Sequence, residues 1–434
     1  MSKITSGNAK VGVIGLGYVG LPLAAAFHAA GYSVLGYDTD PNKPKFLKEG
    51  TPYLKHLGTD LYKTLAASKK FEATTDPARL GECDAIAVCV PTPLDQFHVP
   101  DLSYVVKSAE TIARTVRPGQ LLILESTTYP FTTRKEFRQP LEAKGLTCGK
   151  EIFIAFSPER EDPGNKSHTT VTIPKVVGGL DKPSGELSVA LYAKAFKQVV
   201  PVSSAEVAES AKLLENIFRC VNIAMVNELK IVFDAMGINI WEVIEAARTK
   251  PFGFMPFYPG PGLGGHCIPI DPFYLTYKSK EFGVTSQFIE LAGLINTRMP
   301  YYVVDRTARA LSDRGKPLKG SRVLVLGLAY KPDIDDVRES PSFELIEEFR
   351  ERGCHVDYTD PHVPKTFPTR DHCLDLTGVP CTPESIRSYD ALVVSTAHAA
   401  FPWDMIAKEA KFVVDTRGAM ARYAAQMGDR LFRA

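Results

Sequence analysis

Lys10-Val-Gly-Val-Ile-Gly15-Leu-Gly-Tyr-Val-Gly20 lies near the start of the chain and decides the fold of its first part. An apolar strand over 10–14 leads into glycines spaced Gly-x-Gly-x-x-Gly, and an alanine-rich helix over 21–30 follows. These glycines permit a tight turn and let the backbone approach a pyrophosphate, which the positive end of the helix attracts. The next strand, 33–37, ends at Asp38, an acid placed to bind the adenosine ribose hydroxyls and to repel a 2′-phosphate. The pattern predicts a dinucleotide-binding unit that prefers NAD to NADP.

The rest of the chain alternates between strand-rich and helical stretches. Further strands are predicted over 85–90, 120–124, 152–156, 176–179 and 199–202, with helical segments between most of them, which indicates a parallel, doubly wound α/β sheet. Two long helical stretches, 204–250 and 287–311, contain no strand pattern. From Ser321 a new α/β pattern begins, with strands over 322–327, 355–360, 391–396 and 412–415 and a helix over 342–352. The turn after its first strand begins with Gly327 but lacks the second and third glycines of the Gly-x-Gly-x-x-Gly pattern. This unit should therefore bind something other than a dinucleotide.

We therefore expect two doubly wound, Rossmann-like domains joined by a central helical domain. The expected boundaries are 1–203 for the NAD-binding domain, 204–311 for the helical domain and 312–434 for the second α/β domain. A chain of 434 residues is too long for a single core, in agreement with this division. We expect the active site in the cleft between the two sheets.

Composition excludes several classes of protein. A net charge of +1 provides no electrostatic footprint for nucleic acid or a membrane surface. The eight cysteines include no C-x-x-C pair, so neither a zinc site nor a disulfide framework is predicted. The N-terminus lacks the apolar core of a signal peptide and no run is long enough to span a bilayer. We expect a cytoplasmic protein with reduced thiols and no metal site.

The loop Gly262-Leu-Gly-Gly-His-Cys-Ile-Pro-Ile-Asp271 carries the strongest chemical signal. Its glycines and prolines exclude a helix or a central strand, and they let a ligand approach Cys267 closely. A thiol in a nicotinamide enzyme suggests hydride transfer through a covalent sulfur intermediate. Asp271 is placed to orient a base or hold a water. The alternative is a buried structural cysteine, which is the commoner role of a cysteine in general.

Other polar residues follow predicted strands, at the sheet edge where ligands bind in such folds. They are the hydroxyl residues Thr92, Ser126 and Thr127, and Glu159 in the segment Ser-Pro-Glu-Arg. Farther on, Lys212 and Asn216 lie one helical turn apart. This pair is either part of a solvent-exposed helix face or, if it faces a cleft, a site that stabilises a developing oxyanion.

Taken in this order, these motifs resemble the UDP-glucose/GDP-mannose dehydrogenase family, whose members oxidise a sugar C6 alcohol to a carboxylate. The resemblance runs from Val11 to about Met420. It rests jointly on the glycine turn, the Ser-Thr and Ser-Pro-Glu segments, Lys-x-x-x-Asn, Gly-Gly-x-Cys-x-x-x-Asp, and Lys331 followed by Arg338-Glu-Ser. It implies a four-electron oxidation with NAD, in which Cys267 forms a thiohemiacetal and then a thioester.

The resemblance also implies roles for individual residues. The catalytic residues would be Cys267, Lys212, Asn216, Asp271, Glu159 and Thr127. The cofactor would contact Gly15, Gly17, Tyr18, Val19, Gly20, Asp38, Lys43, Thr92, Ser126, Thr127 and Arg338. The UDP-sugar would contact Glu159, Arg160, Lys212, Asn216, Tyr258, Gly260, Gly264, Lys331 and Arg417. A homodimer or larger homo-oligomer formed through the long central helix is expected as well.

Two departures from the UDP-glucose pattern point to another sugar. Pro163 stands where UDP-glucose enzymes usually have a second Glu, and the Phe- and Pro-rich run 250–259 replaces an arginine-bearing stretch. Both resemble the branch that acts on UDP-N-acetylhexosamines, notably UDP-N-acetylglucosamine, for precursors of surface polysaccharides. UDP-glucose and the UDP-N-acetylmannosamine or -galactosamine epimers remain alternatives.

Two other classes of protein remain as rivals. A two-electron 3-hydroxyacid or 6-phosphogluconate type dehydrogenase would have no role for Cys267, and the α/β unit over 321–415 counts against it. A catalytically silent NAD-binding protein would have no need of Cys267, Lys212, Asn216 and Asp271 together. His266, beside the cysteine, is a candidate for the base that activates Cys267. It is only a secondary candidate, because neighbouring side chains in an extended loop point apart.

Overall fold

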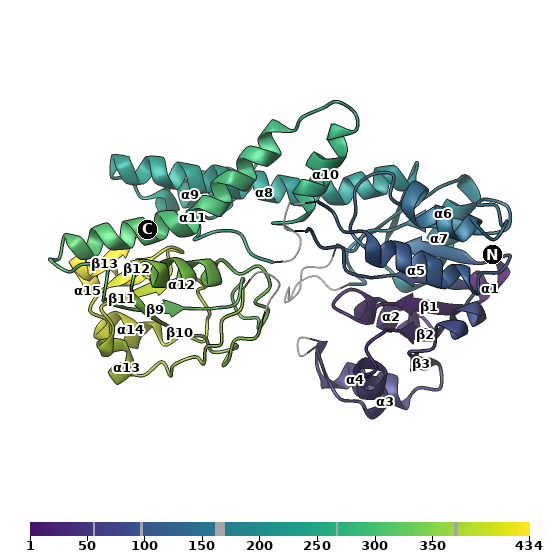
Figure 1. Cartoon of the computed structure of the whole chain (residues 1–434), viewed down its shortest axis with the longest axis horizontal. Coiled ribbons are helices and arrows are strands. Elements are labelled where there is room, and N and C mark those ends of the chain that lie inside the picture. Colours follow the sequence, from purple (N-terminus) through teal and green to yellow (C-terminus); the bar gives the residue numbers. More distant parts are fainter. Residues whose placement is uncertain (55–56, 96–98, 161–169, 266–267, 369–371) are drawn as a thin grey trace. The chain divides into compact units, whose positions relative to one another are not determined.

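The computed structural model describes residues 1–54, 57–95, 99–160, 170–265, 268–368 and 372–434 (Figure 1). These residues form two compact units. The first unit comprises Met1–Glu215 and Phe273–Val284, and the second comprises Asn216–Pro272 and Thr285–Ala434. The division into three domains stays a prediction. None of the helices in the described ranges is long and apolar enough to cross a membrane.

An eight-stranded sheet forms the centre of the first unit, in the order β3-β2-β1-β4-β5-β6-β7-β8. The strands are β1 (Lys10–Ile14), β2 (Ser33–Tyr37), β3 (Phe71–Thr74), β4 (Ala85–Val88), β5 (Leu121–Leu124), β6 (Phe153–Phe156), β7 (Lys175–Gly179) and β8 (Val199–Val202). Neighbouring strands are parallel except β6 and β7, which pair antiparallel through Phe156 and Gly178. The expected α/β sheet is confirmed. The reversal at β7 and the edge strand β3 were not predicted.

Helices of the first unit pack on this sheet. They are α1 (Ser2–Ser6), α2 (Gly20–Ala29), α3 (Asn42–Glu49), α4 (Thr59–Ala67), α5 (Ser103–Ala113), α6 (Arg138–Glu142) and α7 (Lys182–Ala195). Every residue of β4 and β5 is buried, as expected for strands covered on both faces of a doubly wound sheet. Asp181 caps α7 by accepting a hydrogen bond from the backbone N–H of Ser184 at 2.8 Å.

Long helices connect the α/β parts. The 32-residue helix α8 (Ala205–Met236) begins in the first unit and ends in the second. It stops before Gly237, whose φ of 74° is left-handed, and α9 (Ile240–Arg248) follows. The single helical stretch expected over 204–250 is therefore two helices. Next come α10 (Asp271–Lys280), which was not predicted, and α11 (Gln287–Ser312), which contains Pro300.

The second unit has an all-parallel sheet of five strands in the order β10-β9-β11-β12-β13 (Figure 1). The strands are β9 (Arg322–Leu326), β10 (His355–Thr359), β11 (Ala391–Val394), β12 (Val413–Asp415) and β13 (Leu431–Arg433), the last of them unpredicted. The helices are α12 (Pro341–Glu351), α13 (Pro383–Ser388), α14 (Trp403–Glu409) and α15 (Ala424–Met427). Val323 and Val325 belong to one core cluster, whereas Leu324 and Leu326 belong to another. A core on each face confirms the second Rossmann-like domain.

Candidate active site

The glycine turn after β1 has the form that a pyrophosphate needs. A Cβ on Gly15, whose φ is 88°, would lie 2.4 Å from the carbonyl oxygen of Cys89, and one on Gly20 would lie 1.7 Å from that of Gly15. A Cβ on Gly17 would meet no atom within 4 Å. The first and third glycines thus serve the packing of the turn itself, while the second leaves space beside the start of α2. The site fits the pyrophosphate of NAD.

Asp38, at the end of β2, is tied to the same turn. It is 6% exposed, and its Oδ2 accepts a hydrogen bond from the backbone N–H of Leu16 at 2.7 Å. The same oxygen lies 2.8 Å from Nζ of Lys43, an ion pair that was not predicted. Tyr18 and Val19 are half-buried in the turn. The structure therefore brings together the cofactor residues expected from β1, β2 and α3.

Two of the expected cofactor hydroxyls bind other parts of the protein. Oγ of Ser126 accepts a hydrogen bond from the N–H of Val90 at 2.9 Å and donates to its carbonyl at 2.7 Å. Oγ1 of Thr92 donates to the carbonyl of Thr127 at 2.8 Å. These bonds join the loops that follow β4 and β5. Thr92 and Ser126 thereby fix the shape of this sheet edge, where Thr127 is half-buried.

The segment Ser157–Arg160, after β6, is fastened along residues 174–176 at the start of β7. Oγ of Ser157 donates to the carbonyl of Val176 at 2.8 Å, and Nη1 of Arg160 donates to that of Pro174 at 2.8 Å. Between them, Nζ of Lys175 donates to the carbonyl of Pro158 at 3.2 Å. The other terminal nitrogen of the same guanidinium, Nη2, forms an ion pair with Glu215 at 2.6 Å. We call this set of contacts the clamp.

A buried charge cluster lies at the clamp. Nζ of Lys175 donates to Oε2 of Glu125 at 2.6 Å and lies 3.5 Å from Oε2 of Glu159. Tyr192 donates from its hydroxyl to Oε1 of Glu125. Burial raises the pKa of Glu125. Burial alone would lower the pKa of Lys175, but the two carboxylates outweigh it and hold that pKa above its ordinary value.

Of this cluster, sequence reasoning identified Glu159 alone. One signal was present for Glu125, which is a charged residue directly after the fully apolar strand Leu121–Leu124. Lys175 stands before an apolar strand, and a charge in that place is usually solvated. Only the reversal of β7 brings it to the carboxyl end of β6.

Helix α8 carries the expected Lys212 and Asn216 one turn apart, both buried, at 8% and 4% exposure. The ammonium of Lys212 has no hydrogen-bond acceptor among the residues that the structure describes. Nδ2 of Asn216 donates to Oδ2 of Asp271, the first residue of α10, at 2.6 Å. The solvent-face alternative for this pair is therefore wrong. Cys267 and His266 lie outside the described residues.

One turn before Lys212, α8 is anchored by the buried Glu209. Its carboxylate accepts hydrogen bonds from the backbone N–H groups of Phe131 and Thr133 at 2.8 and 2.9 Å. It also accepts one from the hydroxyl of Thr133 at 2.7 Å. Burial raises the pKa of Glu209 to about 7. This anchor, which sequence reasoning missed, holds the start of α8 against the loop after β5.

In the second unit, Arg417 follows β12 and is half-buried, and desolvation lowers its pKa to about 10. Its Nε donates to the carbonyl of Ser395 at 2.8 Å. A Cβ on Gly260 would lie 2.1 Å from Nη1 of Arg417, so only glycine permits their close approach. The N–H of Gly260 donates to Oδ1 of Asn227 at 3.0 Å. Gly260 and Arg417, both expected at the substrate, therefore lie together.

The other residues of this unit expected to bind a ligand, namely Tyr258, Gly264 and Lys331 at the substrate and Arg338 at the cofactor, are more spread out. A Cβ on Gly264 would lie 2.5 Å from Cβ of Tyr330, which precedes the half-buried Lys331. Arg338 forms an ion pair with Asp336 at 2.6 Å. Tyr258 is 41% exposed and donates to Glu245. Gly264 and Lys331 thus share one region, and the structure does not join Tyr258 to it.

Asp360 occupies, in the second sheet, the place that Asp38 occupies in the first. It follows β10, and its Oδ2 accepts hydrogen bonds from the N–H groups of Leu328 and Ala329 at 2.6 and 3.0 Å. The same oxygen lies 2.9 Å from Nε2 of His398. Hydrogen bonds from His398 and the backbone outweigh burial and lower the pKa of Asp360. A histidine therefore contacts the acid that, in a dinucleotide site, would bind a ribose.

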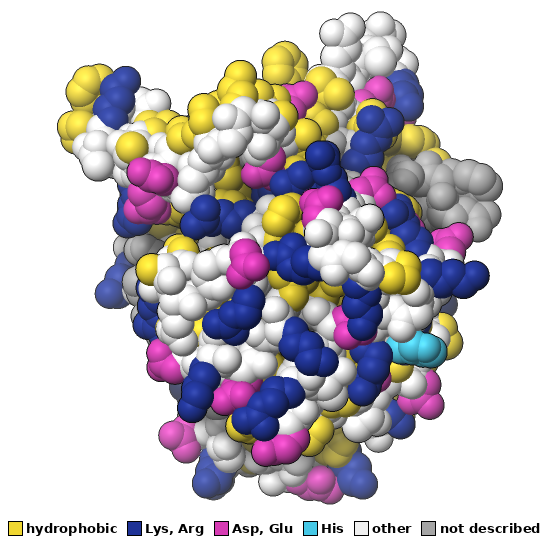
Figure 2. All heavy atoms as spheres, turned by 90° about the vertical axis from the view of Figure 1, so that its left-hand side faces the viewer, with side chains coloured by type: hydrophobic (Ala, Val, Ile, Leu, Met, Phe, Trp, Pro, Cys, Tyr) yellow, Lys and Arg dark blue, Asp and Glu magenta, His cyan; other side chains and the backbone are white. Residues whose placement is uncertain are grey.

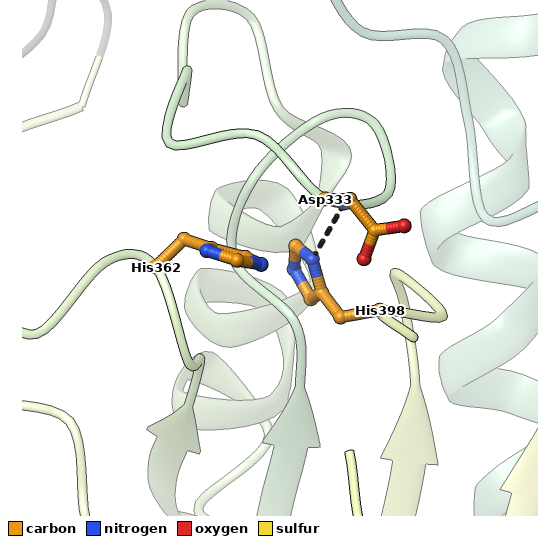
Figure 3. Close-up of side chains that lie close together, drawn as sticks. All are labelled: Asp333, His362 and His398. Carbon is orange, nitrogen blue, oxygen red and sulfur yellow. Dashed lines mark hydrogen bonds between the residues drawn. The ribbon is translucent and has the colours of Figure 1, made fainter. Parts of the chain in front are cut away.

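Asp333, His362 and His398 offer ligand atoms within 4.8 Å of one another (Figure 3). Nδ1 of His398 accepts a hydrogen bond from the N–H of Asp333 at 2.9 Å, drawn as the dashed line, and Nε2 faces Asp360. Both ring nitrogens are engaged, so His398 offers no free lone pair to a cation in this arrangement. The group connects three loops at the carboxyl edge of the sheet.

Comparison with known proteins finds similarity to one family along most of the chain. The NAD binding, central and UDP binding domains of the UDP-glucose/GDP-mannose dehydrogenase family match residues 9–196, 206–298 and 324–422. A UDP-N-acetyl-D-glucosamine 6-dehydrogenase of Pseudomonas aeruginosa is 36% identical over 90% of this chain and 91% of its own length. Protein CapL of Staphylococcus aureus is 34% identical over 98% of this chain and 100% of its own. The structure of UDP-D-ManNAc dehydrogenase from Pyrococcus horikoshii superposes with a TM-score of 0.84 and 32% identity, covering 94% of this chain and 96% of that one.

Proposed function

Because the chain belongs to the UDP-glucose/GDP-mannose dehydrogenase family of NAD-dependent nucleotide-sugar dehydrogenases, we propose that it oxidises a UDP-N-acetylhexosamine at C6. The product is the corresponding uronic acid, a precursor for surface polysaccharide. UDP-N-acetylglucosamine is the first choice of sugar, and UDP-glucose and the other acetamido epimers are the alternatives. The relatives include enzymes named for both the N-acetylglucosamine and the N-acetylmannosamine compounds.

The first unit holds the cofactor in this proposal. The open side of Gly17 and the start of α2 take the pyrophosphate, and Asp38 takes the adenosine ribose. The ion pair with Lys43 keeps the carboxylate of Asp38 in place without removing its charge. NAD supplies the acceptor for the hydride that leaves C6 in each of two oxidations.

Those two oxidations convert the alcohol into a thioester. In the first, C6 loses a hydride and its hydroxyl proton passes to a water near Asp271, while Lys212 and Asn216 hold the oxygen. The thiolate of Cys267 then adds to the aldehyde carbon, and the oxygen takes up a proton to give a thiohemiacetal. Loss of a second hydride and of that proton leaves the thioester. The ammonium of Lys212, which has no acceptor among the described residues, and the bond from Asn216 to Asp271 support this role.

Hydrolysis completes the reaction. Glu159 takes a proton from a water that Thr127 helps to hold, and the water oxygen attacks the thioester carbonyl. The carbon–sulfur bond breaks, Cys267 leaves as thiolate, and the acid is released. Overall the sugar loses four electrons and one water is consumed. The partial exposure of Glu159, at 14%, supports its access to water.

The choice of an acetamido sugar rests on the loop that precedes Gly260. Its large apolar side chains are exposed, with Phe252 at 71%, Met255 at 62% and Tyr258 at 41%. Such side chains can pack on an acetyl methyl group. Losing that packing and one amide hydrogen bond should cost about 2–4 kcal/mol, which is roughly a thirtyfold to thousandfold loss of kcat/KM for UDP-glucose.

A panel of UDP-sugars tests the proposal, with NADH formation followed for each. UDP-N-acetylglucosamine should give the highest kcat/KM and two NADH per sugar. Cys267→Ser is the control, since it should bind NAD normally and form no acid. Equal or better turnover of UDP-glucose would change the sugar assignment, and full activity of Cys267→Ser would exclude the covalent mechanism.

We also propose that the protein works as a homodimer joined along its long helices. Exposed large apolar side chains recur on the second-unit part of α8 and on α11, at Phe218, Met225, Ile231, Val232, Met236, Leu291, Leu294 and Tyr301. Figure 2 shows hydrophobic side chains gathered at the top of one face, whereas charged side chains are scattered over the rest of it. Exposed apolar side chains clustered in this way are typical of a protein interface.

A further inference from the structure

We infer that Lys175 is a positioning residue for Glu159, and that it acts in the hydrolysis of the thioester and not in the two oxidations. The inference rests on the role proposed above for Glu159. Lys175 lies outside every set of residues that the family motifs identify in this chain. What assigns it a role is its position in the clamp.

The first observation is that Lys175 holds both the backbone and the side chain of the Glu159 segment. Its Nζ donates to the carbonyl of Pro158 at 3.2 Å and lies 3.5 Å from the carboxylate of Glu159. The bonds of Ser157 to Val176 and of Arg160 to Pro174 flank this contact on either side. One ammonium therefore contacts both the backbone before Glu159 and its Oε2, while Oε1 accepts a hydrogen bond from the N–H of Arg160 at 2.6 Å.

The second observation is that Lys175 is itself buried and bonded to its neighbours. Its side chain is 4% exposed, and the fully buried Glu125 accepts its shortest hydrogen bond at 2.6 Å. Tyr192 donates to Glu125 in turn, and the ammonium lies 5.5 and 5.4 Å from the ring centres of Tyr192 and Phe196. A cation held by these contacts beside Glu159 gives that carboxylate a defined direction.

The third observation concerns charge. Two carboxylates, Glu125 and Glu159, share one lysine, and Glu125 is fully buried. Without the ammonium, these carboxylates would face each other with no cation from Lys175 between them, and their repulsion would favour a rotamer that turns Glu159 away. Glu159 turned away from its present position would be poorly placed to take a proton from water. The oxidations depend on other residues, Lys212, Asn216 and Cys267.

The two phases of the reaction can be separated by rapid mixing of enzyme with saturating NAD and the UDP-sugar. In Lys175→Met, a burst of NADH approaching two equivalents per active site should form at close to the wild-type rate. Steady-state turnover should then be about thirtyfold slower or more. Acid-quenched samples should contain the sugar bound to the peptide of Cys267, as detected by mass spectrometry.

Lys230→Met is the matched control for the loss of a buried lysine. Lys230 is 1% exposed and bonded to Asp234 at 2.7 Å, but it belongs to the second unit. The Lys230→Met variant should have a lower melting temperature, and its NADH formation should show no burst. In a Glu159→Gln background, Lys175→Met should slow the steady state by less than about threefold more, because the two residues act in one step.

The outcomes distinguish this inference from the function on which it rests. Wild-type enzyme that forms only one NADH per sugar would overturn both. Wild-type enzyme that forms two, combined with equal slowing of burst and steady state in Lys175→Met, would overturn the inference alone. Full additivity with Glu159→Gln would overturn it as well. Should Lys175→Met be insoluble, Lys175→Gln carries the same expectations, since it also lacks the positive charge.

Discussion

Gly17 and Gly20, three residues apart in the glycine turn, should respond in opposite ways to the addition of one methyl group. A Cβ on Gly17 meets no atom within 4 Å, and its φ is outside the left-handed region. Gly17→Ala should therefore leave the cofactor-free protein as stable as before, or about 0.4–1 kcal/mol more stable, since alanine restricts the unfolded chain. The same methyl occupies the space assigned to the pyrophosphate, so NAD should bind at least about tenfold more weakly, a loss of roughly 1.4 kcal/mol.

Gly20→Ala provides the contrast. Its Cβ would lie 1.7 Å from the carbonyl oxygen of Gly15 and 3.2 Å from Cβ of Cys89, and neither the turn nor α2 can yield without losing hydrogen bonds. Overpacking of this kind should cost about 3 kcal/mol or more. Urea unfolding without cofactor and isothermal titration with NAD measure the two effects separately. Unchanged NAD affinity in Gly17→Ala, or a clear loss of stability there, would refute the assignment of this turn.

Two other expected outcomes concern stability and assembly. Because burial raises the pKa of Glu209 from 4.5 to about 7, the unfolded chain loses this proton first as the pH rises, and folding stability falls across that interval. Relative to Glu209→Gln, the wild type should lose about 2–3 kcal/mol between pH 5 and pH 8 in urea unfolding, and a pH-independent difference would contradict this reasoning. Leu291→Asp, which places a charge at a 54% exposed apolar position of α11, should convert a dimer into monomers in sedimentation velocity. A monomeric wild type would disprove the proposed interface.

The strongest sequence patterns predicted structure accurately because they are local. The glycine turn, Asp38 and the first two strands follow from spacing and turn chemistry within thirty residues, and the structure has them where they were expected. The break at Gly237 was visible but was passed over, because helical spacing continues on both sides of it. Strand β3 was missed because its four residues, Phe-Glu-Ala-Thr, lack a buried apolar run.

Contacts between segments far apart in the chain could not be predicted in the same way. The approach of Lys175 to Glu125 spans fifty positions, and it depends on which way β7 runs. Likewise, nothing in the sequence indicates that His398 contacts Asp360 across the second sheet. For the candidate site, family motifs pointed to the residues that we propose to touch substrate or cofactor, whereas their buried partners became visible only in three dimensions.

The reversal of β7 has a consequence for testing the choice of sugar. Because β6 and β7 run in opposite directions, the chain leaves the sheet at Ser157 and returns to it near Pro174 at the same edge, with both ends held by the clamp. Exchanging sequence between these two fastened ends therefore need not change the pairing of β6 with β7. A variant that carries a relative's residues at 161–173, assayed with the panel of UDP-sugars, would test whether Pro163 takes part in the choice of sugar.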